Sequence, residues 1–122
     1  MRKVYVISRY KAKTRRERRF NQQVAAYFCK HIAAEGNRPV APHLFYTDFL
    51  NDDDPEERSA GLAFGIADLD ECDEFLCVVV DNKISEGMAG ELTHIARQGS
   101  KPGHMVHLTR KQAKQLVKEV KR

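Results

Sequence analysis

A glutamate lies among small residues in the stretch 84-ISEGMAGELTHIA-96, directly after the most apolar run of the chain. Ser85 can cap the start of a helix, and Gly87 and Gly90 let a ligand come close to the backbone. Free N–H groups at a helix start bind anions. Glu91 falls in the first or second helical turn, where the helix dipole favours an ionised carboxylate that can act as nucleophile or base. The pattern suggests an anion site beside a reactive acid, and a Glu91 that only complements the dipole is the alternative.

Other chemical motifs are missing from the sequence. Neither GxxxxGK[ST] nor GxGxxG occurs, so the stretch is not a known phosphate or dinucleotide loop. The five histidines form no HExxH pattern, and Cys29, Cys72 and Cys77 form no CxxC pair. We therefore expect no metal and no cofactor. An odd, scattered set of cysteines argues against disulfides and favours the reducing cytoplasm.

The elements that must position these residues alternate along the chain. Apolar and β-branched segments predict strands at 3–8, 38–43, 74–80 and 104–109. Helices are expected after each strand, because Thr14, Asp54, Ser85 and Thr109 are capping residues followed by helical periodicity. Thr14 with Glu17, and Thr109 with Gln112, have the capping-box spacing. Prolines on both sides of the second strand favour an edge position.

The order βαβαβαβα predicts the fold class. It indicates an α/β three-layer sandwich with a parallel, flavodoxin/Rossmann-like sheet of about four strands, in a single domain over residues 1–122. Ligands in such folds bind beyond the carboxyl ends of the strands, where the strand order reverses. In a flavodoxin-like order, the first and third strands flank that point. We therefore expect the exits 8-SRYK-11 and 81-DNKISEGM-88 to meet in one crevice.

Composition limits the classes of partner. The formal net charge is +4, and the run 9-RYKAKTRRERR-19 carries most of the excess. Such a run suits polyanions, but it is more often a solvated helix face, so nucleic acid is a less favoured partner. No apolar run approaches the roughly 18 residues of a membrane span. The basic, apolar start lacks the features of a signal peptide and is interpreted as a strand.

The segment 85-SEGMAGEL-92 resembles the S-x-G-x-x-x-E-L pattern of the 2′-deoxynucleoside 5′-monophosphate N-hydrolases. These enzymes are a branch of the nucleoside 2-deoxyribosyltransferase superfamily, and the resemblance extends from the first strand through 102-PGHMV-106. It implies that Glu91 attacks the anomeric carbon and that Ser85 holds a 5′-phosphate. Such chemistry is coherent, because a carboxylate beneath an anomeric carbon stabilises an oxocarbenium-like transition state and traps the sugar covalently.

The resemblance assigns further residues to the site. The phosphate and sugar contacts would come from Ser8, Arg9, Tyr10, Ser85, Gly87 and Met88. A loop covering the base would contain His43, Phe45, Tyr46 and Asp48, whose aromatic rings can stack on a base or pin the loop to the core. Relatives commonly assemble as dimers or larger oligomers, so a homo-oligomer is implied.

One position departs from the family pattern. The family places an aspartate that assists proton transfer eight residues before the acid that opens the third strand. That acid is Asp73 here, and the position eight residues earlier is Gly65. Asp68 and Asp70 lie nearby in the sequence. Proton transfer would then depend on Asp48, Asp73 or water, and Asp73 joins Glu91 as a predicted catalytic residue.

The sequence therefore predicts an N-glycosidic bond hydrolase or transferase. Its substrate would be a small (deoxy)nucleoside or nucleotide, attacked through a glutamate nucleophile. A nucleotide-binding module with little or no activity is the first alternative, because Gly65 replaces the family's acid. A nucleic-acid-associated basic protein is the second.

Overall fold

One parallel sheet organises the molecule. The computed structural model describes residues 1–120. Strands β1 (Lys3–Ile7), β2 (Arg38–Val40), β3 (Glu74–Val80) and β4 (Gly103–Leu108) pair in the order β2-β1-β3-β4, and all pairs are parallel. The reversal of strand order therefore falls between β1 and β3, as the flavodoxin-like prediction requires.

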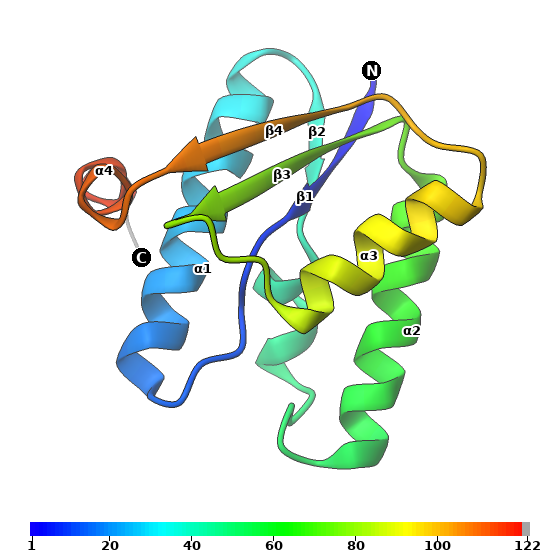
Figure 1. Ribbon diagram of the computed structural model, residues 1–122, viewed down its shortest axis with the longest axis horizontal. Coiled ribbons are helices and arrows are strands. Elements are labelled where there is room, and N and C mark those ends of the chain that lie inside the picture. Colours follow the sequence, from blue (N-terminus) through cyan, green and yellow to red (C-terminus); the bar gives the residue numbers. More distant parts are fainter. Residues whose placement is uncertain (121–122) are drawn as a thin grey trace.

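Helices cover both faces of this sheet (Figure 1). Helices α1 (Arg15–Ala34) and α4 (Arg110–Val117) lie together on one face, and α2 (Pro55–Glu71) and α3 (Glu86–Arg97) lie on the other. Two short 3₁₀ helices, η1 (Pro42–Leu44) and η2 (Tyr46–Asp48), connect β2 to α2. The predicted α/β three-layer architecture is confirmed.

Alternation along β1 divides the core into two clusters. Tyr5 and Ile7 point toward α2 and α3, where they pack with Leu69 and Met88. Val4 and Val6 point to the opposite face and join the cluster that contains residues of α1 and α4. Successive side chains of a strand face opposite sides, so each face of β1 contributes to a different layer. Tyr5 thereby brings a hydroxyl into the layer that contains α3.

Most predicted caps form. Thr14 accepts from the Glu17 backbone at 3.1 Å, Asp54 caps α2, and Ser85 Oγ accepts from the Met88 backbone at 3.2 Å. Thr109 and Gln112 make the complete capping box. The prediction for Glu17 is wrong in one respect, because its carboxylate accepts from Arg110 at 2.8 Å instead of returning to the Thr14 backbone.

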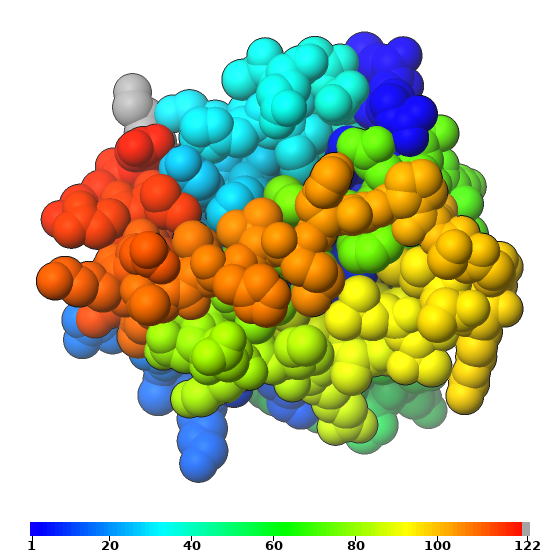
Figure 2. Space-filling view, turned by 45° about the horizontal axis from the view of Figure 1, so that its top comes forward, coloured from blue at the N-terminus to red at the C-terminus, as the bar shows by residue number. Residues whose placement is uncertain are grey.

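The second strand is shorter than predicted. It ends at Val40, because Pro42 begins a 3₁₀ turn and has no N–H to extend the ladder. His43 consequently lies in η1 rather than in a strand. The edge position expected from the prolines is confirmed. At the other edge, β4 is largely exposed and crosses the surface between α3 and α4 (Figure 2). No helix among residues 1–120 is long and apolar enough to cross a membrane.

Candidate functional site

A buried tyrosine holds the glutamate of the opening stretch. The Tyr5 hydroxyl donates a hydrogen bond to Glu91 Oε2, and Tyr5 is only 1% exposed. Tyr5 lies in the middle of β1, whereas Glu91 lies in the second turn of α3. The bond therefore joins two elements 86 positions apart, across the point where the strand order reverses.

Burial determines the protonation of Glu91. It raises the pKa of this carboxyl to about 7, while the hydrogen bond from Tyr5 acts in the opposite direction. The sequence predicts that the helix dipole favours the ionised form of Glu91. That expectation is corrected, because Glu91 lies beyond the first turn, where the dipole acts, and loses its hydration there. A carboxyl with a pKa near 7 exchanges its proton readily near neutral pH.

Gly65 makes room for this pair. It is buried in α2, and a Cβ atom added there would lie 3.4 Å from the Tyr5 hydroxyl oxygen. Any longer side chain would compete with that hydroxyl for space. Gly65 therefore lies next to the place where Tyr5 meets Glu91.

The Tyr5–Glu91 pair borders a cavity of about 310 Å³, which we call the Glu91 cavity. Its wall also includes residues of η1, η2 and α2: His43, Tyr46, Arg58, Gly61, Leu62, Gly65 and Ile66. Gly87 and Gly90 complete it from α3, and a Cβ atom at either would meet no atom within 4 Å. The volume falls within the usual range of small-molecule sites. The two glycines leave open space, as the sequence predicted.

A second cavity of about 680 Å³, the Lys11 cavity, adjoins the first. The residues that border both cavities are His43, Asp52, Arg58, Leu62, Glu86 and Gly87. Residues 8–13 after β1 and residues 85–88 at the start of α3 border the Lys11 cavity from opposite sides. The predicted meeting of the two strand exits is therefore observed.

The residues predicted to bind phosphate all border this second cavity. Ser8, Arg9, Tyr10, Ser85, Gly87 and Met88 belong to its wall. Met88 is nevertheless a core residue, 1% exposed, and its N–H is already satisfied by the Ser85 hydroxyl. Ser8 is 4% exposed, and its hydroxyl has no partner among residues 1–120. A buried polar group without a partner is uncommon and calls for a functional explanation.

His43 connects the two cavities. Its ring stacks on Tyr10 with centroids 5.2 Å apart and an angle of 18° between the planes. Burial lowers the pKa of His43, although Asp52 and the Ser8 backbone oppose the effect. The imidazole is therefore neutral near pH 7 and presents a flat, uncharged surface to a ligand.

The predicted base-covering loop is only partly directed into the site. Tyr46 borders the Glu91 cavity, and its hydroxyl donates to Asp68 at 2.8 Å. Phe45 is 61% exposed and borders a different cavity with Tyr46. Asp48 is exposed and is absent from the walls of both site cavities. Of the four residues predicted for this loop, His43 and Tyr46 therefore border the Glu91 cavity.

The structure does not bring Asp73 to Glu91. Asp73 is exposed just before β3, at the amino end of the sheet, and its carboxylate accepts from the Lys3 N–H at 2.8 Å. The site lies at the carboxyl end. The hydrogen bond with the Lys3 backbone lowers the pKa of Asp73, which suits an acceptor that anchors β1 rather than a proton donor.

The other two acids near Gly65 are also engaged elsewhere. Asp68 accepts from Tyr46, and Asp70 lies 2.7 Å from the His94 ring. Within residues 1–120, no three His, Cys, Asp or Glu side chains are grouped so that they could hold a metal ion.

Residues 2–104 match a family model described as a domain of unknown function, DUF7768. The chain belongs to this family. Among curated proteins, none matches the sequence. The segment matched by the DUF7768 model contains both partners of the Tyr5–Glu91 pair and every residue of the Glu91 and Lys11 cavities.

Two parts of this site were not predicted. Tyr5 lies in the predicted first strand and was not assigned to the site, although a buried tyrosine hydroxyl normally requires a partner. The wall from α2 consists of Glu57, Arg58, Gly61, Leu62, Gly65 and Ile66. Their spacing of three and four positions marks a single helix face, and two glycines on that face indicate a close approach.

Proposed function

We propose that this protein cleaves the N-glycosidic bond of a nucleoside or nucleotide, with Glu91 as the nucleophile. The observation that carries the proposal is a carboxylate held by a buried tyrosine in the wall of a cavity, next to a basic crevice. The resemblance of 85-SEGMAGEL-92 to the N-hydrolase pattern supports it.

The Tyr5 hydrogen bond distinguishes the two oxygens of the Glu91 carboxylate. Tyr5 donates to Oε2, so in the proposed reaction Oε1 attacks the anomeric carbon. The new C–O bond forms as the C–N bond breaks, and the electron pair leaves with the base, which takes a proton from water. A second water then attacks the anomeric carbon, releases the sugar and regenerates the carboxylate, while its proton passes to solvent. A second base in place of that water would give transfer.

The surroundings match the needs of each step. The Tyr5 hydrogen bond orients the carboxylate and favours its ionised form. His43 and Tyr46 supply flat surfaces against which a base can stack. Arg9 and the start of α3 lie in the adjoining Lys11 cavity, where a 5′-phosphate would be neutralised.

A nucleotide-binding module without cleavage is the second candidate. It is favoured by Gly65, which supplies no acid to protonate the departing base. The same contacts would then hold the nucleotide, and Glu91 would recognise a sugar hydroxyl.

Base release distinguishes the two candidates. The protein is incubated with a panel of nucleosides, nucleotides and NAD, and free base is measured by chromatography. Release is expected from the native protein and none from Glu91→Gln. Glu56→Gln is the matched control, because Glu56 is exposed on α2 and borders neither site cavity. Binding without release of any base would favour the second candidate.

The proposal includes a cytoplasmic homo-oligomer. The three cysteines, Cys29, Cys72 and Cys77, are free, which suits a reducing compartment. Phe45 and Phe49 are 61% and 58% exposed and offer an apolar contact surface. Light scattering would test assembly, and a monomeric mass at high protein concentration would contradict it.

A further inference from the structure

A third cavity continues the basic crevice away from Glu91. This Lys83 cavity has a volume of about 310 Å³ and lies between the exits of β1 and β3 and the starts of α1 and α4. It shares Ser8, Arg9, Ala12 and Lys13 with the Lys11 cavity, and it shares no residue with the Glu91 cavity. The three cavities therefore form a series in which the Glu91 and Lys83 cavities are the two ends.

Five cationic side chains in this series have no ion-pair partner within residues 1–120. They are Arg9, Lys11, Lys13, Arg18 and Lys83. Arg18 donates to the Ala12 carbonyl at 3.1 Å, so the other four are the cations without a side-chain hydrogen bond among the described residues. The other arginines nearby are engaged, since Arg58 pairs with Asp52 at 3.2 Å and Arg110 pairs with Glu17 at 2.8 Å. The unpaired charges therefore gather over the Lys11 and Lys83 cavities rather than beside Glu91.

The acids bordering the same region cancel only part of this charge. In the Lys83 cavity, Glu17 is paired with Arg110, whereas Asp81 accepts only from the Arg110 backbone N–H at 2.8 Å and keeps its negative charge. Asp53 and Glu86 offset two of the positive charges of the Lys11 cavity and do not border the Lys83 cavity. Among the described residues, cations without an ion pair therefore outnumber carboxylates without one in both cavities.

Ser8 stands at the junction of the two basic cavities. Ser8 is 4% exposed, and its buried hydroxyl has no hydrogen-bond partner among residues 1–120. A phosphate oxygen at the junction would supply the missing hydrogen bond after a rotation about χ1. This observation is independent of the charges and points to the same ligand group.

The number of cations indicates the size of that group. A phosphomonoester carries about −1.5 to −2 charges near neutral pH, so two cations suffice for it. Arg9 and Lys11 can meet a first phosphate, which leaves Lys13 and Lys83 beyond Ser8 for a second. We propose that the basic crevice binds a pyrophosphate group, so that the preferred nucleotide carries at least two phosphates at its 5′ end. The nucleotide part of this inference rests on the proposed function.

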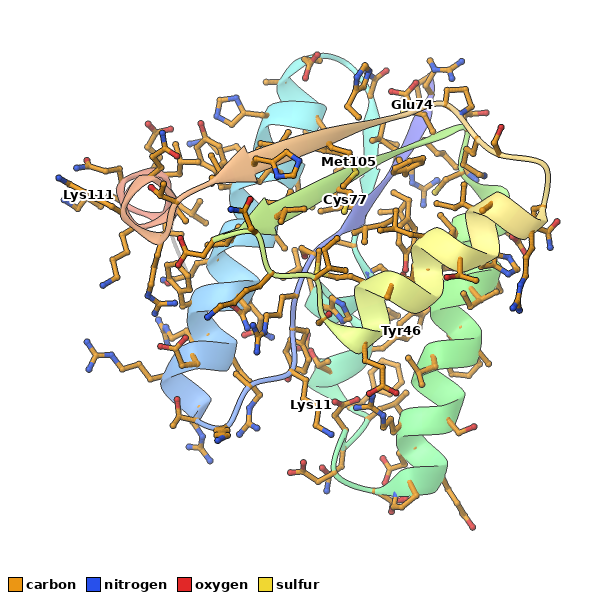
Figure 3. All side chains as sticks on the ribbon, in the orientation of Figure 1. Lys11, Tyr46, Glu74, Cys77, Met105 and Lys111 are labelled. Carbon is orange, nitrogen blue, oxygen red and sulfur yellow. The ribbon has the colours of Figure 1, made fainter. Side chains whose placement is uncertain are left out.

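Calorimetric titration with inorganic pyrophosphate and orthophosphate tests the crevice directly. Lys83→Gln removes a cation of the Lys83 cavity, and Lys11→Gln removes a cation of the Lys11 cavity. Lys111→Gln is the matched control. Lys111 is exposed on α4 and points away from the molecule, whereas Lys11 lies between α1 and α2 (Figure 3). All titrations are made at one ionic strength, because exposed charges are screened by salt.

Pyrophosphate is expected to bind about tenfold more tightly than orthophosphate. Lys83→Gln should weaken pyrophosphate binding about fivefold and leave orthophosphate unchanged. Lys11→Gln should weaken both ligands, and Lys111→Gln neither. Equal affinities for the two anions would overturn the proposal, and so would equal losses in Lys83→Gln and Lys111→Gln, which would indicate diffuse attraction to a basic surface.

These outcomes are separate from those of the glycosidase assay. Selective pyrophosphate binding without release of any base would retain the crevice and reject the hydrolase. Release of base from nucleosides, with no preference for pyrophosphate, would retain the hydrolase and reject this inference.

Discussion

Replacing Glu91 by glutamine should change how the stability of the protein depends on pH. Burial raises the pKa of Glu91 from 4.5 to about 7, so the folded state binds the proton more tightly than the unfolded state does. Protonation of Glu91 therefore stabilises the folded state relative to the unfolded state. This stabilisation is complete below about pH 4.5 and is lost as the pH rises through 7. Each pKa unit corresponds to about 1.4 kcal/mol, so the ionised form costs the folded state about 3 kcal/mol.

Urea unfolding at about pH 5 and about pH 8.5 measures this effect. Glutamine keeps the shape and accepts from Tyr5 but cannot ionise, so the free energy of unfolding of Glu91→Gln should fall less over this range. The free energy of unfolding of the native protein minus that of Glu91→Gln should fall by roughly 2–3 kcal/mol between the two pH values. This corresponds to about 1–2 M in the urea midpoint. His43 and the other titrating groups are common to both proteins and cancel in this difference.

Glu86→Gln is the control, because Glu86 is exposed on the same helix. Its pH dependence should follow that of the native protein. Parallel pH profiles for the native protein and Glu91→Gln would refute the argument, since they would mean that Glu91 keeps its hydration in the folded state.

Three further substitutions probe the surroundings of Glu91. Tyr5→Phe removes the hydrogen bond that lowers the pKa of Glu91. The pH at which the rate of base release rises should therefore move to a higher value. An unchanged pH profile would contradict the role of Tyr5. Gly65→Ala should raise the free energy of unfolding by about 0.5–1 kcal/mol, because alanine favours the helix and its methyl group meets Tyr5 at an ordinary 3.4 Å. A less stable variant would show that the site is tighter than this distance implies. Asp73→Ala removes the acceptor for the Lys3 N–H and should lower the thermal midpoint without reducing base release per folded molecule. Lost release in a fully folded variant would return Asp73 to the catalytic site.

The fold was largely predictable because its signals are local. Capping residues, helical periodicity and apolar strands follow one another along the chain, and their alternation allows few parallel arrangements. The crevice followed from the same logic, since the exits of β1 and β3 must meet where the strand order reverses. The shortening of β2 was missed because the turn chemistry of Pro42 outweighed the extended pattern.

The inner arrangement of the site was less predictable, because it depends on contacts between distant residues. The Tyr5–Glu91 bond joins positions 86 apart, and no local pattern announces it. The position of Asp73 was misleading for the same reason. Asp73 was predicted to substitute for the acid missing at Gly65, yet the parallel sheet places the start of β3 at the edge opposite the site. Charge was also misjudged at Glu91, where burial outweighs the dipole.

The proposed mechanism requires a covalent bond between Glu91 and the sugar. Intact-protein mass spectrometry after rapid acid quenching tests this bond, with a nucleoside or nucleotide from which base is released. An added mass equal to the bound glycosyl group is expected, located on the peptide that contains Glu91 and absent from Glu91→Gln. Release of base with no adduct, at a rate unchanged in Glu91→Gln, would contradict it.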